Sequence, residues 1–269
     1  MLVGAALVAT RSVVGQAGPA SLALLRYLIG TLCLMPFALR GGLPRFAARD
    51  VLPIGLLGIG QFGLLIVLLN WSLLYISSAR AALVFATTPL LTMLLAAAGR
   101  QEPLGARRSV GVLLTIAGVG LALGEKALNG GAGYWGEAAA LGSALLAAGC
   151  GLLYRPYLRR YPVLPVSAFA MLAAVLFLAV LAAGEGLFVA VPDFGVGWLA
   201  VVFIGFCSGL GYYTWLYALG NTSPTKVTVF LALSPITAAL LGLVFGEPLT
   251  AGTAGGVGLV ALGLWVATR

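Results

Sequence analysis

Two arginines lie inside long apolar stretches of this sequence, and they are its clearest candidates for chemistry. Arg11 falls within residues 1–16 and Arg26 within residues 20–39. A charged side chain in hydrocarbon is costly unless it faces a cavity or a partner, so such residues mark binding sites by default. A guanidinium group matches a carboxylate or phosphate in both charge and geometry. We therefore expect these arginines to bind an anionic group; for Arg26 the structural alternative is hydrogen bonding to helix carbonyls.

A second group of candidates combines aromatic and polar side chains on one helical face. Ser208, Tyr212 and Trp215 follow Gly205 at steps of three, four and three residues, which places all four on the same side of a helix. Aromatic walls with a few polar groups suit an apolar or aromatic metabolite. Aromatic residues near helix ends often belong instead to the belt at the membrane interface, so both interpretations stay open for Tyr212 and Trp215.

Five further positions complete the set of expected binding residues. Asn70, Trp71 and Tyr75 lie together near the end of an apolar stretch, and Thr88 and Ser234 each precede a proline. Proline removes a backbone hydrogen bond within a helix, so a carbonyl is freed that can face a cavity. We expect all five to lie along a pathway for a solute.

Composition argues against metal and cofactor chemistry. The chain has no histidine, and its three cysteines each lie inside an apolar stretch. Histidine is the commonest metal ligand and general base, and buried cysteines usually act as small apolar fillers. A phosphate-binding loop of the Gly-x-x-x-x-Gly-Lys-Ser/Thr type is also missing from the sequence. We expect no catalytic residues, no metal and no cofactor.

The elements that must position these residues are membrane helices. Of the 269 residues, 61% are hydrophobic and only 8% are charged, whereas roughly a quarter of the residues of soluble domains are charged. Apolar stretches of about twenty residues, enough to cross ~30 Å of hydrocarbon as helices, alternate with short breaks. They are residues 1–16, 20–39, 51–75, 80–99, 107–124, 135–155, 166–184, 196–218, 225–246 and 251–268. The sequence predicts an all-α integral membrane protein with ten transmembrane helices, the first lacking its start rather than being a signal peptide.

The charges indicate the orientation of these helices. Ten spans place most basic residues on one face: Arg40, Arg45, Arg49, Arg100, Arg107, Arg108, Arg155, Arg159, Arg160, Lys226 and Arg269. Only Arg80 and Lys126 fall on the other face, with most of the acids. Because cytoplasmic loops carry the Lys/Arg excess, we expect an inner-membrane protein with both termini in the cytoplasm. The net charge of +8 then reflects topology, and no nucleic-acid partner is implied.

The two halves of the sequence resemble each other. Residues 71–95 align without a gap on residues 217–241, which matches Pro89 with Pro235. Further matches pair Ser77 with Ser223, Arg80 with Lys226, Gly111 with Gly256 and Gly118 with Gly263. Each half would hold an odd number of spans, so the second would enter the membrane upside down, as in transporters built around a central site.

The sequence resembles the drug/metabolite transporter superfamily in its ten-helix form with two EamA-type domains. The resemblance rests on Ala-Leu-Leu-Arg-Tyr at 23–27, Ser-Pro at 234–235 and Gly-Glu-Pro-Leu at 246–249, and it covers essentially the whole chain. Within the superfamily the sequence is most similar to bacterial amino-acid exporters of the YddG type. The resemblance implies a first helix that lines the cavity and carries a basic residue, so Arg11 is expected to act on the solute more directly than Arg26.

The expected domains are a first EamA-type repeat at 1–124, a linker at 125–134 and a second repeat at 135–269. We expect a secondary transporter that exports small organic solutes, aromatic or neutral amino acids foremost, by alternating access. A lipid flippase of the same fold is the alternative, since the arginines could bind a lipid headgroup. An intramembrane enzyme is a further alternative from another class, but the spans lack the paired carboxylates that would support it. The expected partners are a small solute and membrane lipid. The glycine-spaced fifth and tenth spans would pack on each other or on a second protomer, which leaves monomer and homodimer open.

Overall fold

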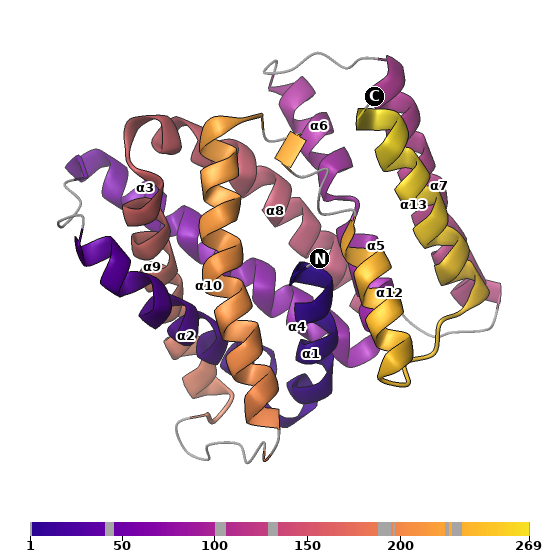
Figure 1. Ribbon diagram of the computed structural model, residues 1–269, viewed down its shortest axis with the longest axis horizontal. Coiled ribbons are helices and arrows are strands. Elements are labelled where there is room, and N and C mark those ends of the chain that lie inside the picture. The colour runs from indigo at the N-terminus through magenta and orange to yellow at the C-terminus, as the bar shows by residue number, and fades with distance from the viewer. Residues whose placement is uncertain are drawn as a thin grey trace.

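The computed structural model describes residues 2–40, 46–99, 106–128, 134–187, 195, 197–223, 226–227 and 233–268, and the regular elements in these ranges are all helices (Figure 1). Their bounds are α1 (Leu2–Ala17), α2 (Pro19–Arg40), α3 (Ala48–Gly58), η1 (Ile59–Leu64), α4 (Leu65–Tyr75), α5 (Ser78–Phe85), α6 (Thr88–Ala98), α7 (Ala106–Leu128), α8 (Trp135–Arg160), α9 (Val163–Gly184), α10 (Gly197–Asn221), α12 (Ser234–Val244) and α13 (Ala251–Thr268). The predicted all-α class is confirmed. The predicted stretch 225–246 is described only at residues 226–227 and from 233 onward.

Six helical segments of the described chain are long and apolar enough to cross a membrane. They are α2, the continuous run from α3 to α4, the pair α5–α6, and α8, α9 and α10. Four shorter apolar helices lie in α1, α7, α12 and α13. This is the helix content of a multi-pass membrane protein.

Two of the predicted spans are not uniform helices. The span predicted at 51–75 contains η1, a π-helical turn between α3 and α4. The span predicted at 80–99 is interrupted at Ala86 and Thr87, between α5 and α6. Pro89 accounts for this second break, because it lacks an N–H and is best accommodated in the first turn of the new helix.

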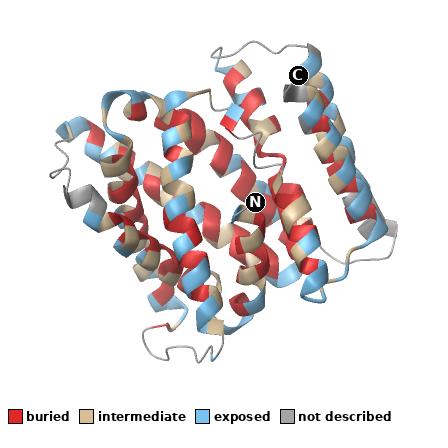
Figure 2. Cartoon of the chain, in the orientation of Figure 1, coloured by how far each residue is buried: buried red, intermediate tan, exposed pale blue. Residues whose placement is uncertain are grey.

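Burial follows the pattern of a protein in lipid. Buried residues gather along the inward faces of the helices, whereas exposed residues follow the outer faces (Figure 2). Many exposed side chains are large and apolar; Leu199 and Val180 are both 73% exposed. Extended apolar surface of this kind is unfavourable in water and suits contact with lipid chains.

Ion pairs mark the two ends of α8. Near its start, the Nε atom of Arg80 lies 3.7 Å from Oε1 of Glu137. Near its end, Nη1 of Arg160 donates to Oδ2 of Asp50 over 2.8 Å, and the hydroxyl of Tyr161 donates to the same oxygen over 2.6 Å. At 1.5 Å per residue, Glu137 and Arg160 are roughly 35 Å apart, a separation that matches the thickness of a membrane.

Two glutamates from late in the sequence cap helices from early in it. Glu185 accepts hydrogen bonds from the backbone N–H groups of Ala20 (3.0 Å) and Ser21 (2.7 Å) at the start of α2. Glu247 accepts from the backbone N–H and the hydroxyl of Ser78, both over 2.8 Å, at the start of α5. Carboxylates at helix N-termini satisfy unpaired N–H groups and oppose the helix dipole, so these contacts tie the two halves together.

Helices α7 and α13 pack along each other at one edge of the bundle (Figure 1). A Cβ atom placed on Gly118 would lie 2.7 Å from the carbonyl oxygen of Gly256, and one on Gly263 would lie 2.6 Å from that of Gly111. Only glycine permits so close an approach of two helix backbones. Of the two expected packings for these helices, the structure contains the one within a single chain.

Candidate functional site

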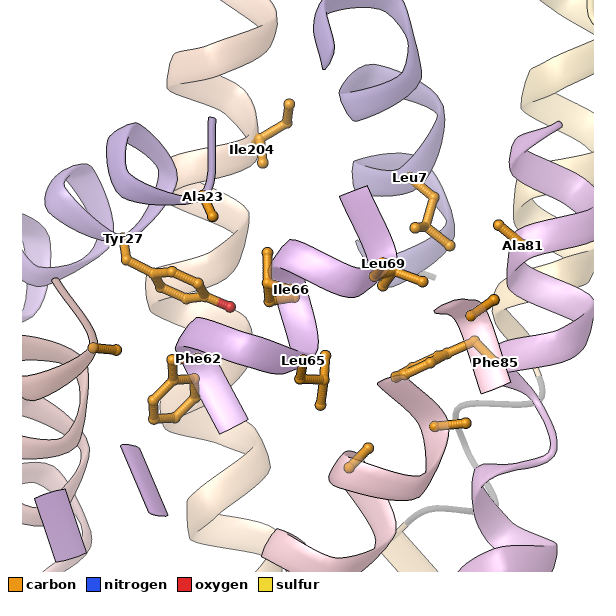
Figure 3. Close-up of a cluster of buried hydrophobic side chains, with 14 of the residues drawn as sticks. Leu7, Ala23, Tyr27, Phe62, Leu65, Ile66, Leu69, Ala81, Phe85 and Ile204 are labelled. Carbon is orange, nitrogen blue, oxygen red and sulfur yellow. The ribbon is translucent and has the colours of Figure 1, made fainter. Parts of the chain in front are cut away.

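A cavity lies between α1, α2, the run from η1 to α4, the end of α5, α8 and α10. It holds about 690 Å³ of empty space, its mouth included, and most of its lining is apolar. Figure 3 shows part of this region: Leu65 and Ile66 lie between Tyr27 on one side and Leu7 and Phe85 on the other. A mostly apolar cavity with a few polar groups suits a small organic molecule.

Arg26 brings a positive charge to the cavity. It lies in α2 and is only 6% exposed, and its Nε donates a hydrogen bond to Oγ of Ser208 in α10 over 2.6 Å. Ser208 in turn donates to the carbonyl oxygen of Ile204 over 2.7 Å, which fixes the orientation of its hydroxyl. Among the described residues, no carboxylate forms an ion pair with Arg26. A buried cation without a counter-charge is unfavourable, so this site favours an anionic ligand.

An aromatic cluster of Tyr27, Phe62 and Tyr212 supports one wall of the cavity, which Tyr212 lines. The ring centroids of Tyr212 and Phe62 are 4.7 Å apart, and Tyr27 lies 5.7 Å from Phe62 and 5.6 Å from Tyr212. Tyr212 itself lines the cavity, as does Trp215 three residues later. The indole Nε1 of Trp215 is buried and has no hydrogen-bond partner in the described part of the chain. This wall therefore offers ring faces for apolar contact and one unused N–H donor.

Four of the residues predicted from the sequence meet at this cavity: Arg26, Ser208, Tyr212 and Trp215. The helical face predicted from their spacing in α10 is the face that borders it. Gln61, which the sequence analysis overlooked, also lines it from η1. The signal was present in the sequence, because Gln61 is an uncharged polar residue within an apolar run.

Arg11 has different neighbours. Its Nη1 donates to the carbonyl oxygens of Leu73 and Ile76 at the end of α4, the latter over 2.6 Å. Its Nε lies 4.0 Å from Oε1 of Glu247. Arg11 does not border the cavity, whereas Arg26 does. In this structure Arg26 is thus the arginine at the cavity, and Arg11 instead bonds the carbonyls that end α4, which lie beside α1.

The other predicted positions also lie outside the cavity lining. Nδ2 of Asn70 donates to the carbonyl oxygen of Pro19 over 2.9 Å, which joins α4 to the first residue of α2. Trp71 and Tyr75 stack edge to face with ring centroids 5.2 Å apart, and Tyr75 is 57% exposed, as a residue of the interfacial belt would be.

Thr88 and Ser234, which precede Pro89 and Pro235, are buried at the starts of α6 and α12. The hydroxyl of Thr88 donates to the carbonyl oxygen of Phe85 over 2.6 Å, across the break between α5 and α6. Ser234 opens α12 and is 1% exposed. Thr88 thus satisfies a carbonyl that the break sets free, and neither residue borders this cavity.

A multi-pass helical protein with a mostly apolar cavity between its helices has the architecture of a membrane transporter. The sequence matches the EamA-like transporter family over residues 1–124 and 134–269. The chain belongs to this family; it is a transporter and not an enzyme.

Two relatives agree with this assignment, and one solved structure shares the fold. The chain is 27% identical over 277 residues to an uncharacterized transporter of Archaeoglobus fulgidus, covering 99% of this chain and 94% of the relative. It is 29% identical over 232 residues to a probable terminal-alkyne amino-acid exporter of Streptantibioticus cattleyicolor, covering 85% and 76% of the two chains. A crystal structure 26% identical in sequence matches with a TM-score of 0.73, covering 99% of this chain and 94% of the other.

Proposed function

We propose that this protein exports amino acids with apolar or aromatic side chains. The observation that carries the proposal is Arg26, a buried guanidinium without an acidic partner among the described residues, at the edge of an apolar cavity. A solute carboxylate would supply the missing counter-charge. The exporter of Streptantibioticus cattleyicolor, named for an amino-acid substrate, adds support from a relative.

The cavity offers complementary contacts for such a solute. Arg26 carries five N–H donors, of which Ser208 takes one, and Nε1 of Trp215 is a further donor. The ring of Tyr212 and the leucines of α1 and α4 would contact the solute side chain. In this arrangement the solute carboxylate is anchored by Arg26 and the solute side chain lies in the apolar part of the cavity. The size and shape of that part set the selectivity among side chains.

We further propose that the helices form two inverted repeats, residues 1–124 and 135–269, joined by 125–134, with ten spans in the inner membrane. The contacts between α7 and α13 support this arrangement. The sequence repeat equates Gly118 with Gly263 and Gly111 with Gly256. A two-fold axis that exchanges the halves would therefore turn the contact of Gly118 with Gly256 into that of Gly263 with Gly111, and both contacts occur. The sequence repeat also equates α6 with α12, and both helices begin with a hydroxyl residue followed by a proline.

The proposed direction of transport follows from the orientation. With both termini in the cytoplasm, the N-terminal end of α1 lies on the cytoplasmic side. The cavity reaches Leu2 and Val3 at this end. At the opposite end of α1, Arg11 and Glu247 join α1 to the turn after α12, and Glu185 caps α2. A cavity bordered by the cytoplasmic end of α1 suits an exporter, which loads its solute from the cytoplasm before rocking open to the other side.

Equilibrium binding to the purified protein tests the proposed solute class. Radiolabelled L-leucine would be displaced by L-phenylalanine and L-propargylglycine, the simplest terminal-alkyne amino acid. The decarboxylated analogue of L-leucine, 3-methylbutylamine, should compete poorly, because it has no carboxylate to pair with Arg26. Movement of labelled phospholipid in proteoliposomes, without amino-acid binding, would instead make the protein a lipid flippase.

A further inference from the structure

We infer that Gln61 is a specificity-determining residue whose side-chain carbonyl accepts a hydrogen bond from the amino group of the solute. The inference rests on the proposed function, since it assigns the second pole of an amino acid to a residue of the same cavity. Arg26 would hold the carboxylate and Gln61 the ammonium group, so that the cavity selects a zwitterion over a plain carboxylate or a plain amine.

The side chain of Gln61 has an unsatisfied acceptor in a buried position. The residue is 3% exposed and lines the cavity, and its Oε1 has no hydrogen-bond partner among the described residues. Most buried polar atoms in folded proteins have a partner, and one without a partner is costly. An unpaired acceptor on a side chain that lines a cavity is therefore best explained by a donor that arrives with the ligand.

The local backbone supports this role. Gln61 lies in η1, a π-helical turn that interrupts the run from α3 to α4. Such turns are rare within helices and recur at functional sites, because the extra residue shifts a side chain away from its regular helical position.

Glycines hold this turn close to α9. A Cβ atom on Gly58 would clash with the backbone of Ala170 in α9, and one on Gly63 would lie 3.0 Å from the ring of Phe177. Close backbone packing of this kind limits the freedom of η1. The Gln61 acceptor is therefore positioned before the solute binds, which lowers the entropy cost of binding.

The hydrogen-bonding groups of the cavity also favour Gln61 as the acceptor for an ammonium group. Of the polar side chains that the lining contributes, Arg26 and Trp215 are donors, the hydroxyl of Ser208 already donates to Ile204, and the hydroxyl of Tyr212 can donate or accept. Gln61 supplies an acceptor without the cost of burying a carboxylate. A neutral acceptor stabilises an ammonium group less than a carboxylate would, which suits a transporter that must also release its solute.

The test compares three ligands of the same shape: L-leucine, its deaminated analogue 4-methylpentanoate and its decarboxylated analogue 3-methylbutylamine. In Gln61→Met the length of the side chain is kept and the acceptor is removed. We expect L-leucine to bind about tenfold more weakly, as for the loss of a hydrogen bond to a charged group, with 4-methylpentanoate changed less than about twofold. Gln61→Glu should keep L-leucine binding and weaken 4-methylpentanoate, because a carboxylate at this position attracts the ammonium group and repels the anion.

A control variant separates this role from a structural one. Thr31→Val removes a buried hydroxyl that likewise has no partner among the described residues, on the helix of Arg26 but outside the cavity lining. It should leave the ratio of the L-leucine and 4-methylpentanoate affinities unchanged. Equal losses of L-leucine and 4-methylpentanoate in Gln61→Met would overturn the inference and leave the proposed function standing. If the wild-type protein binds no amino acid, the proposed function fails, and the assignment of Gln61 fails with it.

Discussion

The Nε atom of Arg26 donates to Oγ of Ser208 over 2.6 Å, and this bond joins α2 to α10 beside the cavity. The two residues are 182 positions apart in the sequence and come from the two halves of the chain. The bond turns the guanidinium group and holds it at the cavity edge. Arg26 is therefore the residue on which the proposed binding of the solute carboxylate depends.

Replacing Arg26 with glutamine should weaken amino-acid binding selectively. We expect L-leucine to bind about ten- to a hundredfold more weakly, because a charge-assisted hydrogen bond contributes about 1.5–3 kcal/mol. Binding of 3-methylbutylamine, which has no carboxylate, should change little. Competition binding on the purified variant gives both values; a loss of equal size for the two ligands would assign Arg26 a structural role.

Replacing Arg11 with glutamine should act on stability. The guanidinium of Arg11 bonds the carbonyl oxygens of Leu73 and Ile76, so its loss leaves helix-end carbonyls unsatisfied at a cost of about 1–3 kcal/mol. We expect a lower temperature of thermal unfolding in detergent, with the ratio of L-leucine to 3-methylbutylamine affinity unchanged. A selective loss of L-leucine binding in the folded variant would show that Arg11 contacts the solute after all.

A pair of glycine substitutions tests the packing of α7 on α13. Gly118→Ala forces a methyl group against the carbonyl of Gly256, and overpacking of this kind costs about 1–3 kcal/mol. Gly120 lies two residues further along the same helix, and no atom lies within 4 Å of a Cβ placed there. Gly120→Ala should therefore be neutral or slightly stabilising, since alanine favours a helix over glycine. Thermal unfolding of both variants measures the difference; equal melting temperatures would contradict the close approach.

The proposed orientation is open to cysteine labelling. In a variant without Cys33, Cys150 and Cys207, a cysteine at position 130 should react with a membrane-impermeant maleimide added from outside. A cysteine at position 160 should react only after the membrane is permeabilised. Labelling in the reverse order would place the termini outside and would also reverse the proposed direction of transport.

The sequence predicted the helices better than their irregularities. Apolar length and the breaking residues were enough to locate the helical segments, and the proline at 89 accounts for the division between α5 and α6. The π-helical turn at η1 has no such local signal, because it depends on how Gly58 and Gly63 approach α9. For this reason the register of Gln61 followed only from the tertiary structure.

The candidate site was predictable where one helix determines it. The spacing of Ser208, Tyr212 and Trp215 fixed a common face of α10, and this face borders the cavity. The partners of the two arginines depend on contacts between helices that are distant in the sequence. Arg11 meets the end of α4, 62 and 65 residues away, and no pattern in the sequence distinguishes that contact from one with a solute.

The most direct test of amino-acid transport that depends on Arg26 is the flux of radiolabelled L-leucine in proteoliposomes that contain either the wild-type protein or Arg26→Gln. We expect the wild-type protein to carry L-leucine well above the rate of protein-free liposomes, and excess unlabelled L-phenylalanine to compete. The Arg26→Gln protein, shown to be folded by its thermal unfolding, should carry little. Amino-acid flux that is absent from the wild-type protein, or equal in the two proteins, would contradict the account.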